Sequence, residues 1–494
     1  MNGLLGFSLH SILNLNLDLN WILFIHFVLA TIFIGIIISV RRPVGVAFAW
    51  MFIVVSFPVF GIGLYILIGD RPVGRKLTRK IIRMQREYTR ITENMRKQFA
   101  SDRQLLPLEG RALSILAEAK NGAPVVSGNK IELFTNSLEI LQHFIDDIHG
   151  AKKSLHLEFY IWALGGDADR VCDALIAAAK RGVACRVLLD SLGSKDWFKS
   201  EWPTRFKVAG IQVTEALPIQ IGRFQFRRAD IRLHRKIFVI DGAVAWTGSM
   251  NMVDPRTFKQ DSGVGEWVDA LVRVEGPVVS QFELTFSFDW SVDNPKITQF
   301  IDHENTITAH EGGALAQEFS SGPVYRDDIL YQVLLSAIMD SREELTITTP
   351  YFGPDDGLIQ ALMAAANRGV QVTLIVPKLN DSTLVAWSSR SIYSDLLGAG
   401  VKIAEFHGGL LHTKSLLIDK RIAIFGSVNF DQRSLRLNFE ISLIVYNKDF
   451  CSKLQVLIDS YLKQSDMVNL AKWEKRPRWH RFVENAAHLT SPLL

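Results

Sequence analysis

The sequence predicts an α/β protein of two tandem half-domains, preceded by a two-helix transmembrane hairpin. Three observations indicate this fold. Matching segments recur about 180 to 190 residues apart. Within each repeat, short apolar runs alternate with Ala-rich helical patterns that end in Gly, which is typical of α/β layers around a largely buried sheet. Near the N-terminus, two long runs carry no charged residue, and about 20 apolar residues are enough to span a bilayer.

The predicted hairpin occupies residues 1–70, with spans at about 21–40 and 44–68 that are separated by Arg41-Arg42-Pro43. The second run contains Pro and Gly, which membrane helices tolerate. The alternative is that both runs form helices buried in a protein core. Two adjacent uncharged runs of this length favour the membrane interpretation.

A basic juxtamembrane helix and linker is predicted at residues 71–128. Between Arg71 and Arg103 there are eleven Lys or Arg residues and three Asp or Glu residues. Under the positive-inside rule this side of the membrane is cytoplasmic, so the body that follows is expected on the cytoplasmic side. The segment either lies along anionic headgroups or is simply a solvated helix.

The remaining chain is an internal repeat, with a first half at residues 129–310 and a second at 311–494. The segment Ala174-Leu-Ile-Ala-Ala-Ala-Lys-Arg-Gly-Val matches Ala361-Leu-Met-Ala-Ala-Ala-Asn-Arg-Gly-Val. A period this long indicates duplicated domains rather than a solenoid.

One octapeptide pattern, His-x-Lys-x-x-x-x-Asp, occurs once in each half and is followed both times by Gly-Ser-x-Asn. Two copies with the same tail argue against chance. The candidate catalytic residues are His234, Lys236 and Asp241 in the first copy and His412, Lys414 and Asp419 in the second. The candidate supporting residues in the tails are Ser249, Asn251, Ser427 and Asn429.

The spacing within the pattern suits a phosphate ester. Leu233–Ile240 and Leu411–Ile418 are predicted to be buried strands, on which His and Lys two positions apart share a face. Lys supplies positive charge, and His supplies a nucleophilic or proton-transferring nitrogen. The Asp residues have the opposite parity, so we expect them to support the site. Small Gly-Ser loops let backbone and hydroxyl donors approach a phosphate.

The duplicated pattern resembles that of the phospholipase D superfamily. The resemblance implies two phospholipase D-like α/β/α half-domains that face each other across a pseudo-twofold axis, with both His-Lys pairs in one site. It also implies that Asp269 and Glu440, which occupy matching positions in the repeat, hydrogen-bond a catalytic His and stabilise its imidazolium form. Asp269 stands where Glu is commoner in the family.

More narrowly, the chain resembles bacterial cardiolipin synthases of the A type, through Glu158-Phe-Tyr-Ile-Trp162, Thr247-Gly-Ser-Met-Asn-Met-Val-Asp-Pro-Arg256 and Glu405-Phe-His-Gly-Gly-Leu-Leu-His-Thr-Lys414. This implies a multi-pass enzyme of the bacterial inner membrane that converts two phosphatidylglycerol molecules into cardiolipin and glycerol. It implies a phosphatidyl-histidine intermediate and no cofactor or metal. By analogy His234 is the nucleophile and His412 the acid and base.

Other readings of the motifs remain open. A membrane phospholipase D-type hydrolase would release phosphatidic acid from the same intermediate. A nuclease would use the same His-Lys pairs, but the net charge of only +4 does not indicate nucleic acid as a partner. A non-catalytic membrane scaffold would not need two intact motifs. A basic and aromatic segment, Lys472-Trp-Glu-Lys-Arg-Pro-Arg-Trp-His-Arg-Phe482, is either interfacial or a packed terminal helix.

Overall fold

The computed structural model describes residues 19–40, 44–69, 88–218, 230–294, 308–323 and 328–491. It divides into two compact units. One comprises residues 1–74 with 220–230, and the other comprises residues 75–219 with 231–494.

The first unit contains α1 (Leu19–Ser39), α2 (Val44–Ser56) and α3 (Phe60–Ile68). The second predicted span is thus two helices, because the chain turns at residues 57–59, where Pro58 lacks a backbone donor and Val59 has a φ of 63°. Among the described residues, no helix reaches the length and hydropathy of a membrane span. The hairpin itself stays a prediction, and residues 41–43 and 71–87 lie outside the described residues.

The described part of the second unit begins with helical residues 88–99 and α5 (Leu108–Asn121), and its first half follows them. The elements of that half are β1 (Val126–Phe134), α6 (Ser137–Gly150), β2 (Ser154–Phe159), α7 (Asp167–Lys180), β3 (Ala184–Asp190), α8 (Lys195–Lys199), α9 (Trp202–Val208), β4 (Gln212–Ala216), β5 (Ile237–Ile240), β6 (Val244–Gly248), β7 (Trp267–Val268), β8 (Leu271–Glu275) and α10 (Val279–Asp293).

The second half follows the same overall order with several short elements added, and it ends in a further strand and two further helices. Its elements are β9 (Ala314–Ser321), α11 (Ile329–Asp340), β10 (Glu344–Thr348), β11 (Phe352–Gly353), α12 (Asp356–Asn367), β12 (Gln371–Pro377), α13 (Thr383–Ser391), α14 (Tyr393–Gly398), β13 (Lys402–Phe406), β14 (Leu410–Leu411), β15 (Ser415–Ile418), β16 (Ile422–Gly426), β17 (Phe430–Asp431), α15 (Gln432–Arg436), β18 (Glu440–Val445), α16 (Lys448–Lys463), β19 (Ser465–Met467), α17 (Leu470–Glu474) and α18 (Arg478–His488).

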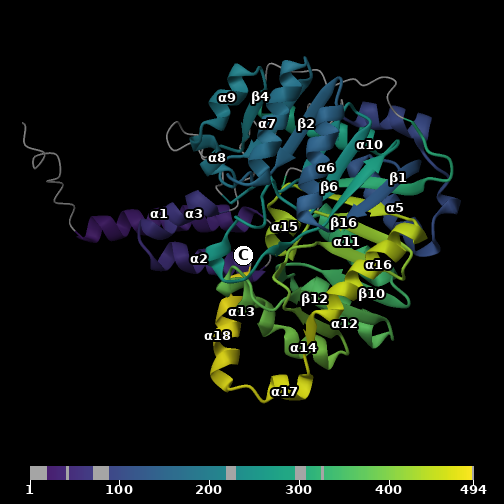
Figure 1. Ribbon diagram of the computed structural model, residues 1–494. Helices are drawn as coiled ribbons and strands as arrows, with labels where there is room; N and C mark the ends of the chain where they lie inside the picture. The colour runs from purple at the N-terminus through teal and green to yellow at the C-terminus, as the bar shows by residue number, and fades with distance from the viewer. Residues whose placement is uncertain are drawn as a thin grey trace, which may run out of the picture. The chain divides into compact units, whose positions relative to one another are not determined.

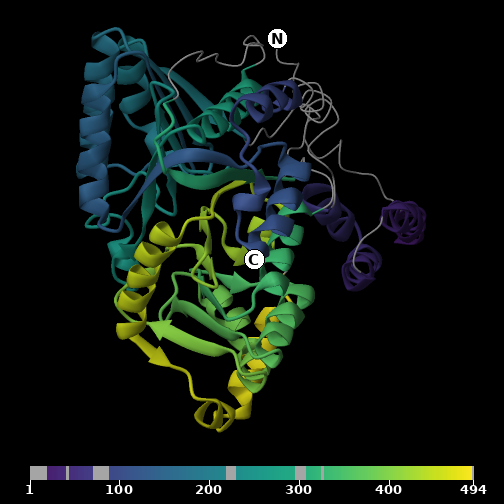
Figure 2. The ribbon, with the colours of Figure 1, turned by 90° about the vertical axis from the view of Figure 1, so that its right-hand side faces the viewer.

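Within the described residues the main strands form one 15-stranded sheet, in the order β19-β13-β12-β10-β15-β16-β18-β9-β1-β8-β6-β5-β2-β3-β4. The order read outward from β9 matches the order read outward from β1, as pseudo-twofold symmetry requires. The antiparallel pair β1 and β9 joins the halves. Figure 1 shows the first half in teal above the second half in green and yellow, and Figure 2 shows the same stacking from the side.

Alternate residues of a strand pack against different helical layers on the two faces of the sheet. Phe238 and Ile240 of β5 face a core that contains residues of α6 and α7, whereas Ile237 and Val239 face a second core that contains Phe282 of α10. Alternate residues of a strand point to opposite faces, so each half has helices on both sides of its sheet. The second core also takes in α16, and it is shared by the two halves. The predicted α/β layering is confirmed.

Candidate active site

The strands that carry the two motifs are shorter than predicted. We expected strands at Leu233–Ile240 and Leu411–Ile418, but β5 begins at Ile237 and β15 at Ser415. The residues before them cross to the other half. The N–H of His234 donates to the carbonyl of Phe439 at 2.9 Å, and the N–H of His412 donates to that of Val268 at 2.9 Å. Each His is therefore held in register with the opposite half rather than in its own sheet.

Each imidazole is hydrogen-bonded by a carboxylate from the other half. His234 Nδ1 lies 2.9 Å from Glu440 Oε2, and His412 Nδ1 lies 2.6 Å from Asp269 Oδ1. The sequence indicated that these acids bind a His, but not that the pairs are exchanged between the halves. Because Nδ1 is occupied in both rings, Nε2 is the nitrogen that can act on a substrate.

The two serines of the Gly-Ser-x-Asn tails hold these carboxylates. Ser249 Oγ donates to Asp269 at 2.6 Å, and Ser427 Oγ donates to Glu440. Each serine oxygen in turn accepts the backbone N–H of the residue that follows the acid, Ala270 or Ile441. Both hydroxyls therefore orient the carboxylates, and they support the site indirectly by fixing the His–acid pairs.

Both histidines line one cavity of about 360 Å³ at the junction of the halves. Asn251 and Asn429 line it from the two halves as well. Asn251 Oδ1 accepts from the backbone N–H of Ile161 at 3.2 Å, which leaves its amide group to donate to a ligand. The other lining residues are Tyr160, Ile161, Arg232, Lys259, Trp267, Tyr351, Phe352, Gly353, Val385, Ser388, Asp431, Arg433, Asn438 and Ser491.

The motif lysines are buried directly beside the histidines. Lys236 Nζ donates to the carbonyl of His234 at 2.6 Å, and Lys414 Nζ donates to that of His412 at 2.7 Å. Burial lowers the pKa of Lys236 to about 8, against the opposing pull of Glu440. Burial, with a smaller contribution from Lys236, lowers the pKa of Lys414 well below its ordinary value, although Asp269 and Glu440 oppose it. An anion bound in this site would favour the charged form of both lysines.

Burial also lowers the pKa of the imidazoles, to about 4 for His234 and about 3 for His412, although Glu440 and Asp269 oppose it. Burial raises the pKa of each acid, but the imidazole and lysine beside it outweigh that effect, and the pKa falls below its ordinary value. At neutral pH the substrate-free site therefore holds neutral imidazoles against ionised carboxylates.

The two motif aspartates lie at the far ends of their strands from the histidines. Asp241 accepts three backbone N–H groups at residues 152–154, and Asp419 accepts three at residues 342–344. Each thereby anchors the loop that leads into β2 or β10, the strand that pairs with its own motif strand. Neither side chain is among the cavity-lining residues described above, and a supporting role stays the prediction for both.

Aromatic rings pack on each histidine, and sequence reasoning gave them no role. The Tyr160 ring lies 5.2 Å from that of His234, and the Trp267 ring lies 4.2 Å from that of His412. Tyr160 falls in a segment that carries the family resemblance and Trp267 does not, and no local pattern indicated contact of either ring with His. The rings restrict the imidazoles to one orientation.

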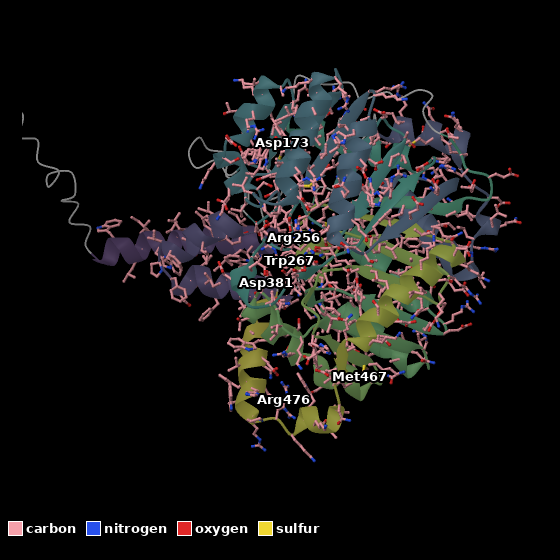
Figure 3. All side chains as sticks on the ribbon, in the orientation of Figure 1. Asp173, Arg256, Trp267, Asp381, Met467 and Arg476 are labelled. Carbon is pink, nitrogen blue, oxygen red and sulfur yellow. The ribbon has the colours of Figure 1, made fainter. Side chains whose placement is uncertain are left out.

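An ion pair bridges the halves beside these rings. Lys259 Nζ lies 3.0 Å from Asp381, which also accepts the Tyr351 hydroxyl at 2.8 Å. Figure 3 shows the labelled Trp267 and Asp381 close together at the junction of the halves. The pair could not be predicted, because its partners are 122 residues apart and match no motif.

The residue between His and Lys is also engaged by the other half. Arg235 donates to the carbonyls of Glu440 at 3.1 Å and Ser321 at 3.0 Å, and it pairs with Asp289 of α10. The matching Thr413 donates to the carbonyl of Val268 at 3.2 Å. The variable position of each motif thus helps to fix the motif against the opposite half.

Comparisons with known proteins agree with this geometry. A family model described as "Cardiolipin synthase, PLD-like domain" matches residues 144–290 and 334–462. Cardiolipin synthase A of Serratia proteamaculans (strain 568) is 42% identical over 463 residues, covering 93% of this chain and 95% of that protein. Cardiolipin synthase A of Klebsiella pneumoniae (strain 342) is 42% identical with the same coverage.

Among solved structures, phosphatidylserine synthase of Haemophilus influenzae superposes with a TM-score of 0.60. It is 14% identical and covers 78% of this chain and 100% of its own, so it supports the fold alone. Because the family model spans both halves and the curated relatives match over nine-tenths of the sequence, the chain belongs to the cardiolipin synthase family of phospholipase D-like phosphatidyltransferases.

Proposed function

We propose that this enzyme converts two molecules of phosphatidylglycerol into cardiolipin and glycerol through a phosphatidyl-histidine intermediate. The observation that carries the proposal is the pair of histidines in one cavity, each with Nδ1 fixed by a carboxylate of the other half. Two such rings can divide nucleophilic and proton-transfer roles within one site.

In the first step His234 Nε2 attacks the phosphorus of one phosphatidylglycerol. The bond from phosphorus to the headgroup glycerol breaks, and His412 Nε2 gives its proton to the departing oxygen. His412 is neutral in the empty site, because burial lowers its pKa to about 3. The arriving phosphodiester anion raises that pKa and so favours the protonated ring that the step needs. Asp269 stabilises the imidazolium.

In the second step His412, now neutral, takes the proton of the headgroup hydroxyl of a second phosphatidylglycerol. That oxygen attacks phosphorus, the N–P bond breaks, and His234 is restored. Asn251 and Asn429 hold the non-bridging oxygens from opposite sides of the cavity, while Lys236 supplies positive charge from behind. The near symmetry of the site permits the opposite assignment of the two histidines, which family analogy alone decides.

The runner-up is a hydrolase in which water resolves the intermediate. Transfer to an alcohol is favoured because the curated relatives are named cardiolipin synthases.

The enzyme acts at the bacterial inner membrane, which the first unit is proposed to cross twice with the catalytic body on the cytoplasmic side. The described helices of that unit carry many large apolar side chains that are exposed, among them Phe27, Phe48, Phe52 and Phe60. An exposed apolar surface of this kind is stable in lipid and costly in water.

The test is incubation of the purified full-length protein with vesicles of phosphatidylglycerol that carry an isotope label in the headgroup. Mass spectrometry should find one labelled glycerol for each cardiolipin. Phosphatidic acid without cardiolipin would replace the proposal with the hydrolase. His234→Ala should form neither product, while His407→Ala, a matched change at an exposed His outside the cavity, should keep the activity.

A further inference from the structure

Helix α18, which the catalytic mechanism does not use, carries an exposed apolar stripe. Trp479 is 63% exposed, Phe482 74% and Leu489, just after the helix, 82%. Their spacing of three and seven residues places them on one face of a helix. The opposite face is anchored, because Glu484 and Ala487 are buried and Glu484 binds Arg476 at 2.7 Å.

Exposed apolar side chains also lie on α13, against which α18 packs. Leu384 and Trp387 of α13 are exposed, as is Leu379 just before it. Val385 and Ser388 of the same helix line the catalytic cavity. Figure 1 shows α13 and α18 together along the outer side of the second half. The apolar surface of α13 and α18 thus adjoins the cavity wall.

Basic side chains lie on α18 and in the segment just before it. Residues 470–489 contain five Lys or Arg and two Asp or Glu, and one of those acids, Glu484, is already neutralised by Arg476. The exposed cations are Lys472, Lys475, Arg478 and Arg481. Exposed aromatic residues with adjacent cations match the chemistry of an anionic bilayer surface, in which the rings enter the headgroup region and the cations meet phosphates.

We propose that α13 and α18 form a docking surface that holds the rim of the catalytic cavity against an anionic phospholipid bilayer. Docking lets a lipid headgroup pass from the bilayer into the cavity while its acyl chains stay in the membrane. The inference deepens the proposed function, on which its kinetic consequence rests. The docking itself needs no turnover, and it can be measured in an enzyme that makes no product.

The test places a single nitroxide label on the full-length protein in vesicles. The three native cysteines are buried, so a cysteine introduced by Phe482→Cys is selectively labelled. Matched controls are Val456→Cys on α16 (69% exposed) and Val208→Cys on α9 (84% exposed). Paramagnetic oxygen, which concentrates in lipid, and a water-soluble nickel chelate report the surroundings of each label.

In vesicles of phosphatidylcholine with phosphatidylserine, the label at position 482 should be relaxed by oxygen, and the two control labels by the nickel chelate. In phosphatidylcholine alone the label at 482 should move toward water. A label at 482 that stays in water in both vesicle types would overturn the proposal. So would one shielded from both reagents, because a protein segment would then cover the stripe.

Two matched double variants test how much the positive charge contributes to docking. Arg478→Gln with Arg481→Gln should lower the ratio of docked to undocked label roughly fivefold for each arginine removed. Lys448→Gln with Lys453→Gln, exposed on α16, should leave the ratio unchanged. The arginine variant should also slow turnover of phosphatidylglycerol in vesicles but not of a short-chain, water-soluble phosphatidylglycerol. Equal loss on both substrates would contradict the docking role.

Discussion

Shortening Glu440 by one methylene group tests whether His–acid pairing across the halves drives catalysis. The change Glu440→Asp keeps the charge and removes one C–C bond of about 1.5 Å. The carboxylate is drawn back, and its distance to His234 Nδ1 rises from 2.9 Å to about 4 Å, beyond hydrogen-bond range. Ser427, Ser434 and Asn438, which also donate to this carboxylate, lose their acceptor at the same time.

The expected loss can be bounded from the contacts. A hydrogen bond to a charged group contributes about 1.5–3 kcal/mol, which is roughly 10- to 150-fold in rate if it is realised fully as the ring becomes positive. A ring that also loses its orientation and tautomer costs up to about 10⁴-fold, the loss seen when the acid of a catalytic triad is replaced by its amide. We expect kcat to fall between about 10² and 10⁴-fold.

The assay is cardiolipin formation from phosphatidylglycerol in mixed micelles, followed by mass spectrometry, with thermal unfolding as a check of the fold. Glu405→Asp is the matched control, because it removes the same methylene from a carboxylate that pairs with Arg390 at 3.6 Å and is not among the cavity-lining residues. If the folded Glu440→Asp protein kept more than about a third of the control rate, the imidazole would not depend on this carboxylate.

Three further predictions follow from the same geometry. His234→Ala and His412→Ala should each abolish turnover with membrane insertion intact, and full residual activity in either would refute the two-histidine mechanism. Asp241→Ala and Asp419→Ala should each lower the free energy of unfolding by about 2–3 kcal/mol, because three backbone N–H groups lose their acceptor. At low temperature the kcat of each variant should stay within about twofold of the unmodified enzyme. Denaturant titration measures the first effect and a rate assay measures the second. Binding of orthovanadate at pH 7 should take up about one proton. The imidazoles have pKa values of about 4 and 3 in the empty site, so one becomes protonated only when a bound anion raises its pKa. Equal calorimetric binding enthalpies in buffers of different ionisation enthalpy would exclude this proton uptake.

Repetition in the sequence was enough to predict most of the body. The matched Ala-rich segments and the two motifs imply duplicated α/β layers, and the observed strand order is consistent with that symmetry. The Asp-Gly pair at 241–242 is typical of a tight hairpin turn, and both residues have positive φ between β5 and β6. These features depend on local pattern, which the sequence displays directly.

The exchange of partners between the halves could not be predicted. A motif shows that His234 and Glu440 each belong to a site, but not which half supplies the acid for which ring. The same holds for the strand limits, because apolar residues at 233 and 411 continue the strand pattern while their backbone pairs with the other half. Contacts between distant segments decide both features, and no local periodicity records them.

This exchange implies that neither half is a reduced version of the whole enzyme. A first half alone would keep His234 but lose Glu440, and a second half alone would keep His412 but lose Asp269. Each would also expose part of the shared core between α10 and α16. Pseudo-twofold symmetry in this fold therefore does not supply two half-sites that work independently. It supplies one site in which each half orients the motif imidazole of the other.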